Sequence, residues 1–158
     1  MSSEPYSATV HRAWAADLDT TTLYELLRLR VDVFVVEQQT AFPELDGRDL
    51  EPRARHYWLG GHGKPEPVLG CVRLLKEPDG GYRIGRLCVR KDVRGHRLSR
   101  RLMDAVLAEV GDGECVTQSQ LPHVSFYERY GFVVDGEQFE WGGVRHVPMR
   151  RVKREYPR

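Results

Sequence analysis

The sequence predicts an α/β domain, a mixed sheet with helices on both faces. Short runs rich in β-branched and aromatic residues, bounded by glycine and proline, recur along the chain and are typical of strands. Two segments, beginning near Asp19 and near Leu98, have apolar residues every three to four positions, as amphipathic helices do. The segment from Tyr82 to Gln118 is predicted to be strand, helix and strand, which implies a right-handed parallel crossover.

In the first half of the chain, turn residues separate the expected strands from one amphipathic helix. Asp19 to Thr22 offer N-cap side chains. The apolar stripe that follows predicts a helix with one packed face, formed by Leu23, Leu26, Leu27, Val31 and Phe34. Pro43 and Gly47 predict that this helix ends and that a loop follows within residues 33–49. The expected strands are residues 8–14, 56–59, 68–75 and 82–89, with turns at residues 60–67 and 78–81.

The second half begins with a helix and ends on a hairpin. Leu98, Leu102, Val106 and Val110 recur every four residues, and Gly111 suits the C-terminal cap of that helix. The remaining expected elements are a strand at 115–118, a short helix at 123–130, a strand at 131–134 and a hairpin of 139–141 with 145–152.

Composition places the chain in a broad class before any motif is considered. Its 158 residues fit one domain, residues 1–158, and its net charge of +1 gives no general attraction to polyanions. No run of 18 apolar residues argues for a membrane span, and the N-terminal segment has no signal-peptide pattern. Cys71, Cys88 and Cys115 have no metal or redox spacing. We therefore expect reduced core thiols and no metal in a cytoplasmic protein.

Residues 87–101, LCVRKDVRGHRLSRR, have the residue order of an anion-binding site. A strand ends at Val89, a basic turn containing Gly95 follows, and a helix begins near Leu98. The first N–H groups of a helix have no partner within it, and the helix dipole adds partial positive charge there. Three guanidinium groups add full positive charge, those of Arg94, Arg97 and Arg100.

This segment resembles the coenzyme A-binding motif of the GCN5-related N-acetyltransferase (GNAT) superfamily, [RQ]-x-x-G-x-[GA], whose backbone N–H groups hold the pyrophosphate. Arg94 matches the first position, whereas Arg97 stands where the middle glycine is usual and Ser99 where glycine or alanine is usual. A side chain at position 97 must point away from the phosphates or contact them itself. The resemblance assigns to coenzyme A a loop formed by Arg94, Gly95, His96, Arg97, Leu98 and Ser99.

A second stretch, FYERYGF at residues 126–132, resembles the other motif of the family, (L/F)-Y-x-x-x-G-F. In the family this tyrosine protonates the departing thiolate, a role that the resemblance gives to Tyr127. Asparagine often stands seven residues earlier and contacts the pantetheine arm; that position is Gln120 here. The family fold has a mostly antiparallel sheet in which two strands splay apart to bind the cofactor. The resemblance places at the splayed strand end Leu87, Cys88 and Val89.

Further segments narrow the resemblance to the ElaA-type branch of the superfamily. They are FVVEQ, LDGRD and RHYWLG within residues 34–60, and RHVPM at residues 145–149. Members of this branch tend to lack the middle glycine of the phosphate loop, which is consistent with Arg97. The natural substrate of the branch is poorly defined, so the resemblance implies more about fold and cofactor than about the acceptor.

Acetyl transfer to an amine requires a proton donor for the thiolate and a proton acceptor for the amine. Tyr127 suits the first role, because a thiol pKa near ~8.5 and a phenol pKa near ~10 are close enough for proton transfer. For the base we consider Glu37 first and His146 second, with His56 or a water chain as alternatives. Each of these side chains also has an ordinary structural interpretation. Cys88 has no base at a recognisable spacing, so we expect direct transfer in a ternary complex without an acyl-enzyme.

The sequence thus predicts an N-acetyltransferase that moves an acetyl group from acetyl-CoA to a primary amine of a small molecule or peptide. The alternatives are a non-catalytic module that binds coenzyme A or acyl-CoA, and a nucleic-acid binder that uses the basic turn, which the net charge disfavours. The acidic loop from Glu44 to Asp49 either attracts a cationic amine or is an ordinary solvated loop. No membrane partner is expected. The hairpin at 139–149 and the first helix present apolar edges that a homodimer would cover.

Overall fold

The computed structural model describes residues 9–60 and 67–151. Ala8, Val152 and most of the turn expected at 60–67 lie outside this range. The described strands are β1 (His11–Trp14), β2 (Arg55–Gly60), β3 (Val68–Lys76), β4 (Tyr82–Val89), β5 (Cys115–Gln120), β6 (Phe132–Val134), β7 (Phe139–Trp141) and β8 (Val144–Arg151). The described α-helices are α1 (Thr20–Val31), α2 (Leu98–Val110) and α3 (Val124–Glu128).

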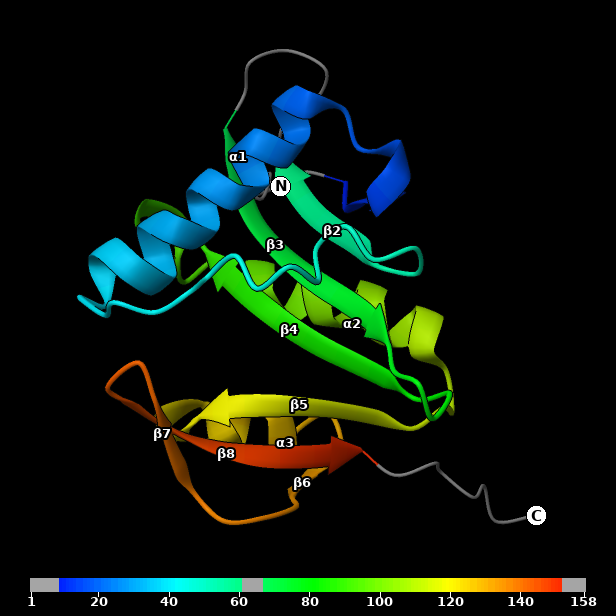
Figure 1. Cartoon of the computed structure of the whole chain (residues 1–158), viewed down its shortest axis with the longest axis vertical. Coiled ribbons are helices and arrows are strands. Elements are labelled where there is room, and N and C mark those ends of the chain that lie inside the picture. Colours follow the sequence, from blue (N-terminus) through cyan, green and yellow to red (C-terminus); the bar gives the residue numbers. More distant parts are fainter. Residues whose placement is uncertain (1–8, 61–66, 152–158) are drawn as a thin grey trace, which may run out of the picture.

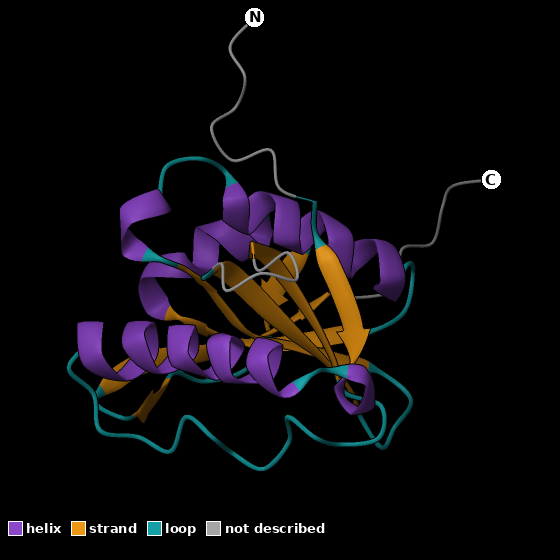
Figure 2. Ribbon diagram, turned by 90° about the horizontal axis from the view of Figure 1, so that it is seen from above, coloured by secondary structure: helices purple, strands orange, loops and turns teal. Residues whose placement is uncertain are grey.

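The described strands form one mixed sheet of eight strands in the order β1-β2-β3-β4-β5-β8-β6, with β7 paired to β8. Each neighbouring pair is antiparallel except β4 and β5, which are parallel because α2 returns the chain between them. Figure 1 shows α1 on one face of the sheet and α2 on the other, and Figure 2 shows the strands as a layer between the helices. The predicted fold class and the predicted crossover are confirmed.

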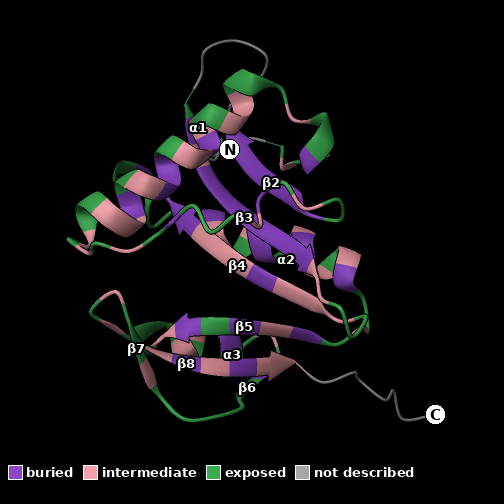
Figure 3. Ribbon diagram, viewed as in Figure 1, coloured by how far each residue is buried: buried purple, intermediate pink, exposed green. Residues whose placement is uncertain are grey.

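Two apolar clusters hold the helices to the sheet. Leu102, Met103 and Val106 of α2 are fully buried against the strands, and Leu26 and Leu29 of α1 pack on the opposite face. Figure 3 shows that buried residues are concentrated on β2 and β3, the strands between β1 and β4. None of the helices in the described ranges is both long and apolar enough to cross a bilayer.

The first helix extends further than the sequence predicted. Asp19 caps it by accepting a hydrogen bond from the Thr22 N–H at 2.6 Å, as expected. After Val31 the chain continues as a π-helix, η2 (Asp32–Glu37). No glycine or proline lies between Val31 and Pro43, so nothing in the local sequence ends the helix at Val31. Wide π-helical turns often occur at functional sites, and this turn ends beside the candidate active site.

Candidate active site

Strands β4 and β5 form a V. Their backbones pair at two positions in the described chain, Tyr82 with Cys115 and Arg83 with Val116. The Thr117 hydroxyl then donates to the Ile84 carbonyl at 2.8 Å and marks the apex, beyond which the strands diverge (Figure 1). The β4 edge that faces this gap lacks a strand partner in the part of the chain that the structure describes. Unpaired strand edges present N–H and C=O groups to ligands.

A β-bulge in β4 helps to produce the divergence. Cys71 and Arg73 of β3 pair with Cys88 and Gly85, so a single β3 residue faces two β4 residues between these pairs. Arg86, one of the two, has a left-handed backbone with φ of 58°. A bulge bends its strand and re-aims the residues that follow it. The structure therefore places the predicted Leu87, Cys88 and Val89 on the arm of the V beyond the apex.

The backbone of Val89 faces the open side of the V. The Arg90 N–H donates to the Leu69 carbonyl of β3 at 2.8 Å, so by alternation along the strand the Val89 N–H points the other way. This N–H can bind a carbonyl oxygen or an amide of a ligand lying between the arms.

The predicted phosphate loop joins the end of β4 to the start of α2. Arg97 is the N-cap of α2 and has left-handed backbone angles, φ 59° and ψ 25°, and no side chain of the described residues caps the helix there. The first helical bond runs from the Arg101 N–H to the Arg97 carbonyl at 3.2 Å. The N–H groups of Leu98, Ser99 and Arg100 therefore have no partner within the helix. Free N–H groups at a helix start can bind an anion.

The left-handed conformation explains why glycine is usual at position 97 of this motif. A residue with a Cβ atom is disfavoured at positive φ by roughly 1–2 kcal/mol, and glycine is not. The side chain of Arg97 is exposed, as is the neighbouring Gly95 with φ of 88°. Arginine at position 97 therefore destabilises the local backbone conformation, but its exposed side chain leaves the N–H groups of the helix start accessible.

Tyr127 lies on α3, behind the apex of the V. It is buried, with Phe126 and Phe132 packed edge-on against its ring at centroid distances of 5.2 and 5.8 Å. Burial raises the pKa of the Tyr127 phenol to about 12, and a hydrogen bond with Thr117 opposes this rise. Thr117 is the same residue that marks the apex. The hydroxyl is therefore protonated at neutral pH and lies next to the start of the gap.

Gln120 ends β5 and contacts the other side of the V. Its amide nitrogen donates to Oε1 of Gln38 at 3.0 Å, and the Gln38 amide returns a longer contact of 3.5 Å. Gln38 directly follows η2. Sequence reasoning identified Gln120 but did not assign Gln38 to the site, although Gln38 is the last residue of the FVVEQ segment; the π-helical turn that precedes it places it there.

The candidate base Glu37 is bound to the phosphate loop. Its carboxylate accepts two hydrogen bonds from the Arg94 guanidinium, at 2.6 and 2.7 Å. This pairing holds the pKa of Glu37 below its usual range. A carboxylate that binds its proton so weakly is a poor acceptor for an ammonium proton, so the geometry weighs against Glu37 as the base.

The two histidine candidates have different environments. His56 is buried beneath the acidic loop and its Nε2 contacts the Asp49 carbonyl at 3.0 Å, so it is structural and does not face the V. His146 lies on β8 opposite Gln120, half-buried and stacked on Phe139. Its Nδ1 lies 2.8 Å from the Val144 carbonyl. A carbonyl only accepts, so Nδ1 of His146 is the donor, and in the neutral imidazole Nε2 is the nitrogen with the lone pair.

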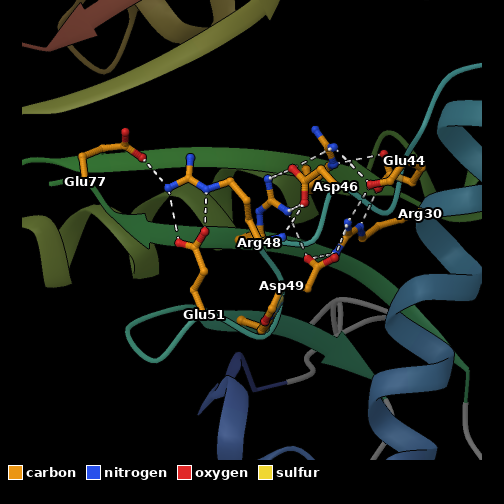
Figure 4. A network of polar contacts seen from close by, with 10 residues as sticks. Arg30, Glu44, Asp46, Arg48, Asp49, Glu51 and Glu77 are labelled. Atoms are coloured by element: carbon orange, nitrogen blue, oxygen red, sulfur yellow. Dashed lines mark hydrogen bonds and ion pairs between the residues drawn. The ribbon is translucent and has the colours of Figure 1, made fainter.

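The acidic loop is exposed at residues 45–47, whereas the carboxylates at its two ends, Glu44 and Asp49, are buried and paired with arginines, an arrangement that neither alternative for the loop predicted. Glu44 and Asp49 are buried and face arginines of α1, β3 and β4 (Figure 4). Glu44 pairs with Arg30 at 2.6 Å, and Asp49 pairs with Arg30 at 2.6 Å and with Arg73 at 3.1 Å. The signal for this network is the placement of both arginines in apolar stretches of sequence, where a charge requires a partner.

The segment that precedes the acidic loop, residues 38–42, contacts both sides of the V. The ring of Phe42 lies 5.9 Å from the Arg86 guanidinium, and a Cβ atom on Gly142 would lie 2.9 Å from the Phe42 Cβ. Gly142 forms the turn between β7 and β8, beyond β5. Residues 38–42 therefore reach from one arm of the V to the other and form one wall of the site.

A split pair of parallel strands, an uncapped helix start at the end of one strand and a buried tyrosine at the apex define a class of proteins. The comparisons with known proteins identify the class.

The family model for the GNAT acetyltransferase domain matches residues 52–153, so the chain belongs to the GNAT acetyltransferase family. A UPF0039 protein of Mycobacterium bovis is 50% identical over 146 residues, which cover 90% of this chain and 92% of that protein. The crystal structure of Escherichia coli ElaA has a TM-score of 0.81 at 31% identity and covers 91% of this chain and 99% of its own. The crystal structure of an acyl-CoA N-acyltransferase from Pseudomonas aeruginosa has a TM-score of 0.80 at 33% identity. The match covers 92% of this chain and 100% of that protein's chain. The chain is an ElaA-like member of this acyltransferase family.

Proposed function

We propose that the chain is an N-acetyltransferase that moves an acetyl group from acetyl-CoA to a primary amine. The observation that carries this proposal is the V between β4 and β5, with Tyr127 at its apex and the uncapped start of α2 at its mouth. The backbone N–H groups of the loop from Arg94 to Ser99 would hold the pyrophosphate. The pantetheine arm would lie between the strands, within reach of the Val89 N–H and the Gln120 amide.

Transfer is direct in this proposal, with amine and thioester bound together. Cys88 is the nearest alternative nucleophile, but a hydrogen bond with Cys71, 3.7 Å away, and burial both raise its pKa. A thiol that stays protonated is a poor nucleophile. The Val89 N–H would stabilise the thioester oxygen, and Tyr127 would donate its proton to the departing sulfur. Burial raises the pKa of a thiol as it raises that of the phenol, so the pKa values of donor and acceptor rise together.

The acceptor would approach from the α1 face, where His146 and residues 38–42 lie. The carboxylates of the acidic loop are paired with arginines, so they do not provide free negative charge that would attract a cationic amine. The acceptor is therefore a small-molecule or peptide amine that is recognised by shape and hydrogen bonding.

The experiment that tests the function supplies acetyl-CoA and a panel of amines, with mass spectrometry of the products and assay of the released thiol. We expect acetylation of at least one primary amine and release of one thiol per acetyl group. Binding of coenzyme A without turnover of any amine would indicate the binding module instead. Absence of coenzyme A binding would contradict the proposal altogether.

We expect His146→Gln to lower kcat at pH 7 by roughly ten- to a hundredfold, because the amine then loses its proton to water alone. An alkyl ammonium has a pKa near ~10.4, so the deficit should shrink as the pH approaches 10 and the free amine accumulates. The measurement is kcat against pH for both proteins with the same amine. Equal profiles would remove His146 from the mechanism.

A further inference from the structure

The last turn of the first helix touches both arms of the V. At the end of the π-helical turn of residues 32–37, two consecutive residues have different partners: Glu37 accepts from Arg94 beyond the end of β4, and Gln38 accepts from Gln120 at the end of β5. The contacts tie the mouth of the V to α1.

The Arg94 side chain is already occupied by the protein. Its Nε donates to the Val89 carbonyl at 3.0 Å, and its two terminal nitrogens donate to Glu37 at 2.6 and 2.7 Å. Three of its five N–H groups are thus taken. Its positive charge lies against the negative charge of Glu37, so the pair adds little net charge to attract a phosphate.

These contacts position the loop that the pyrophosphate would use. Arg94 ends a short 3₁₀ turn (Lys91–Val93) and directly precedes Gly95. The Val93 N–H makes an ordinary backbone bond of 3.1 Å in this turn, but the bond from the Arg94 N–H is long, at 3.5 Å. Side-chain anchoring through Arg94 therefore fixes the direction of the N–H groups that follow. Bidentate arginine–carboxylate pairs combine strength with a defined geometry.

We propose that Glu37 is a positioning residue that sets the phosphate loop through Arg94, and that the Arg94 side chain acts as a strut and not as the phosphate ligand. This inference rests on the proposed function, because it takes coenzyme A as the ligand of the loop. According to this inference, Glu37 contributes to binding of the co-substrate and not to proton transfer.

The test is a double-mutant cycle of Glu37→Gln, Arg94→Gln and both together, with calorimetric titration of coenzyme A. If the pair acts as a strut, each single variant should bind roughly tenfold more weakly, and the double variant no more weakly than either single one. If Arg94 binds phosphate itself, Glu37→Gln should release it and leave binding unchanged or tighter, which would overturn the inference. Wild-type protein that binds no coenzyme A would instead overturn the proposed function and this inference with it.

Kinetics separate positioning from proton transfer. Glu37→Gln should raise KM for acetyl-CoA while kcat and its pH profile stay as in the wild type. Loss of the acidic limb of the kcat profile would make Glu37 a base and overturn the inference. Glu25→Gln is the matched control, since Glu25 lies on α1 and its pair with Arg28, at 3.7 Å, is remote from the loop. It should leave both KM and coenzyme A affinity unchanged.

Discussion

Tyr127→Phe is expected to lower kcat for acetyl transfer by about 10² to 10³-fold while coenzyme A binds nearly as tightly as before. The substitution removes one hydroxyl, which in the proposed mechanism is the proton donor for the departing thiolate. Without a donor the sulfur must leave as an anion in a largely buried site, where charge is poorly solvated. The loss should therefore appear in kcat and not in KM for acetyl-CoA.

The aromatic ring itself should stay in place. Phe126 and Phe132 pack edge-on against Tyr127, and phenylalanine preserves both contacts. The lost hydrogen bond with Thr117 costs about 1 kcal/mol of unfolding free energy, so the variant remains folded. Thermal unfolding of both proteins checks this directly.

Tyr130→Phe is the matched control. Tyr130 lies one turn further along, half-buried, and its ring also packs against Phe126, at 5.4 Å. The Tyr130→Phe variant also loses a phenol hydroxyl, but one that does not lie at the apex of the V, so it should retain wild-type kcat. Because the pKa of Tyr127 is raised to about 12, the wild type should also keep its proton donor through pH 10. Full activity of Tyr127→Phe would remove this residue from the chemistry.

The fold was predictable because its periodicities are strong and local. The apolar stripe of α2 and the Gly142-Gly143 hairpin appear as expected, and strand β4 has the predicted bounds. The π-helical turn was not predicted, since its residues also suit an ordinary helix end. Its last residue, Glu37, and the following Gln38 contact partners that are distant in sequence, Arg94 and Gln120.

The site was predictable where backbone geometry defines it and not where side chains meet across the fold. The motif at Arg94 to Ser99 indicates an exposed helix start, and the structure has one. The pairing of Glu37 with Arg94 spans 57 residues of sequence and has no local signature. The same is true of the acidic loop, whose partners come from three different elements.

Arg30→Met is expected to cost about 3–5 kcal/mol of unfolding free energy, because it leaves two buried carboxylates without their shared cation. The Arg30 side chain is 2% exposed and pairs with both Glu44 and Asp49. Methionine preserves much of the volume of the arginine's aliphatic stem. The loss of unfolding free energy therefore comes from removal of the charge and not from a cavity. Urea unfolding of the whole chain measures it, and Arg28→Met, exposed on the same helix, should change stability by less than about 0.5 kcal/mol.

The pH dependence identifies the cause of that loss. Burial alone would raise the pKa of Asp49, but hydrogen bonds from Arg30 and the charges of the arginines hold it below its usual value. In the wild type this carboxylate therefore stabilises the fold above the unfolded-state pKa of ~3.9, and the contribution is lost as the pH falls below it. Without Arg30, burial dominates and the folded protein binds protons more tightly than the unfolded chain. The deficit of Arg30→Met should then be smaller at pH 5 than at pH 8, whereas a deficit independent of pH would show that packing, and not the buried ion pairs, holds the loop over the V.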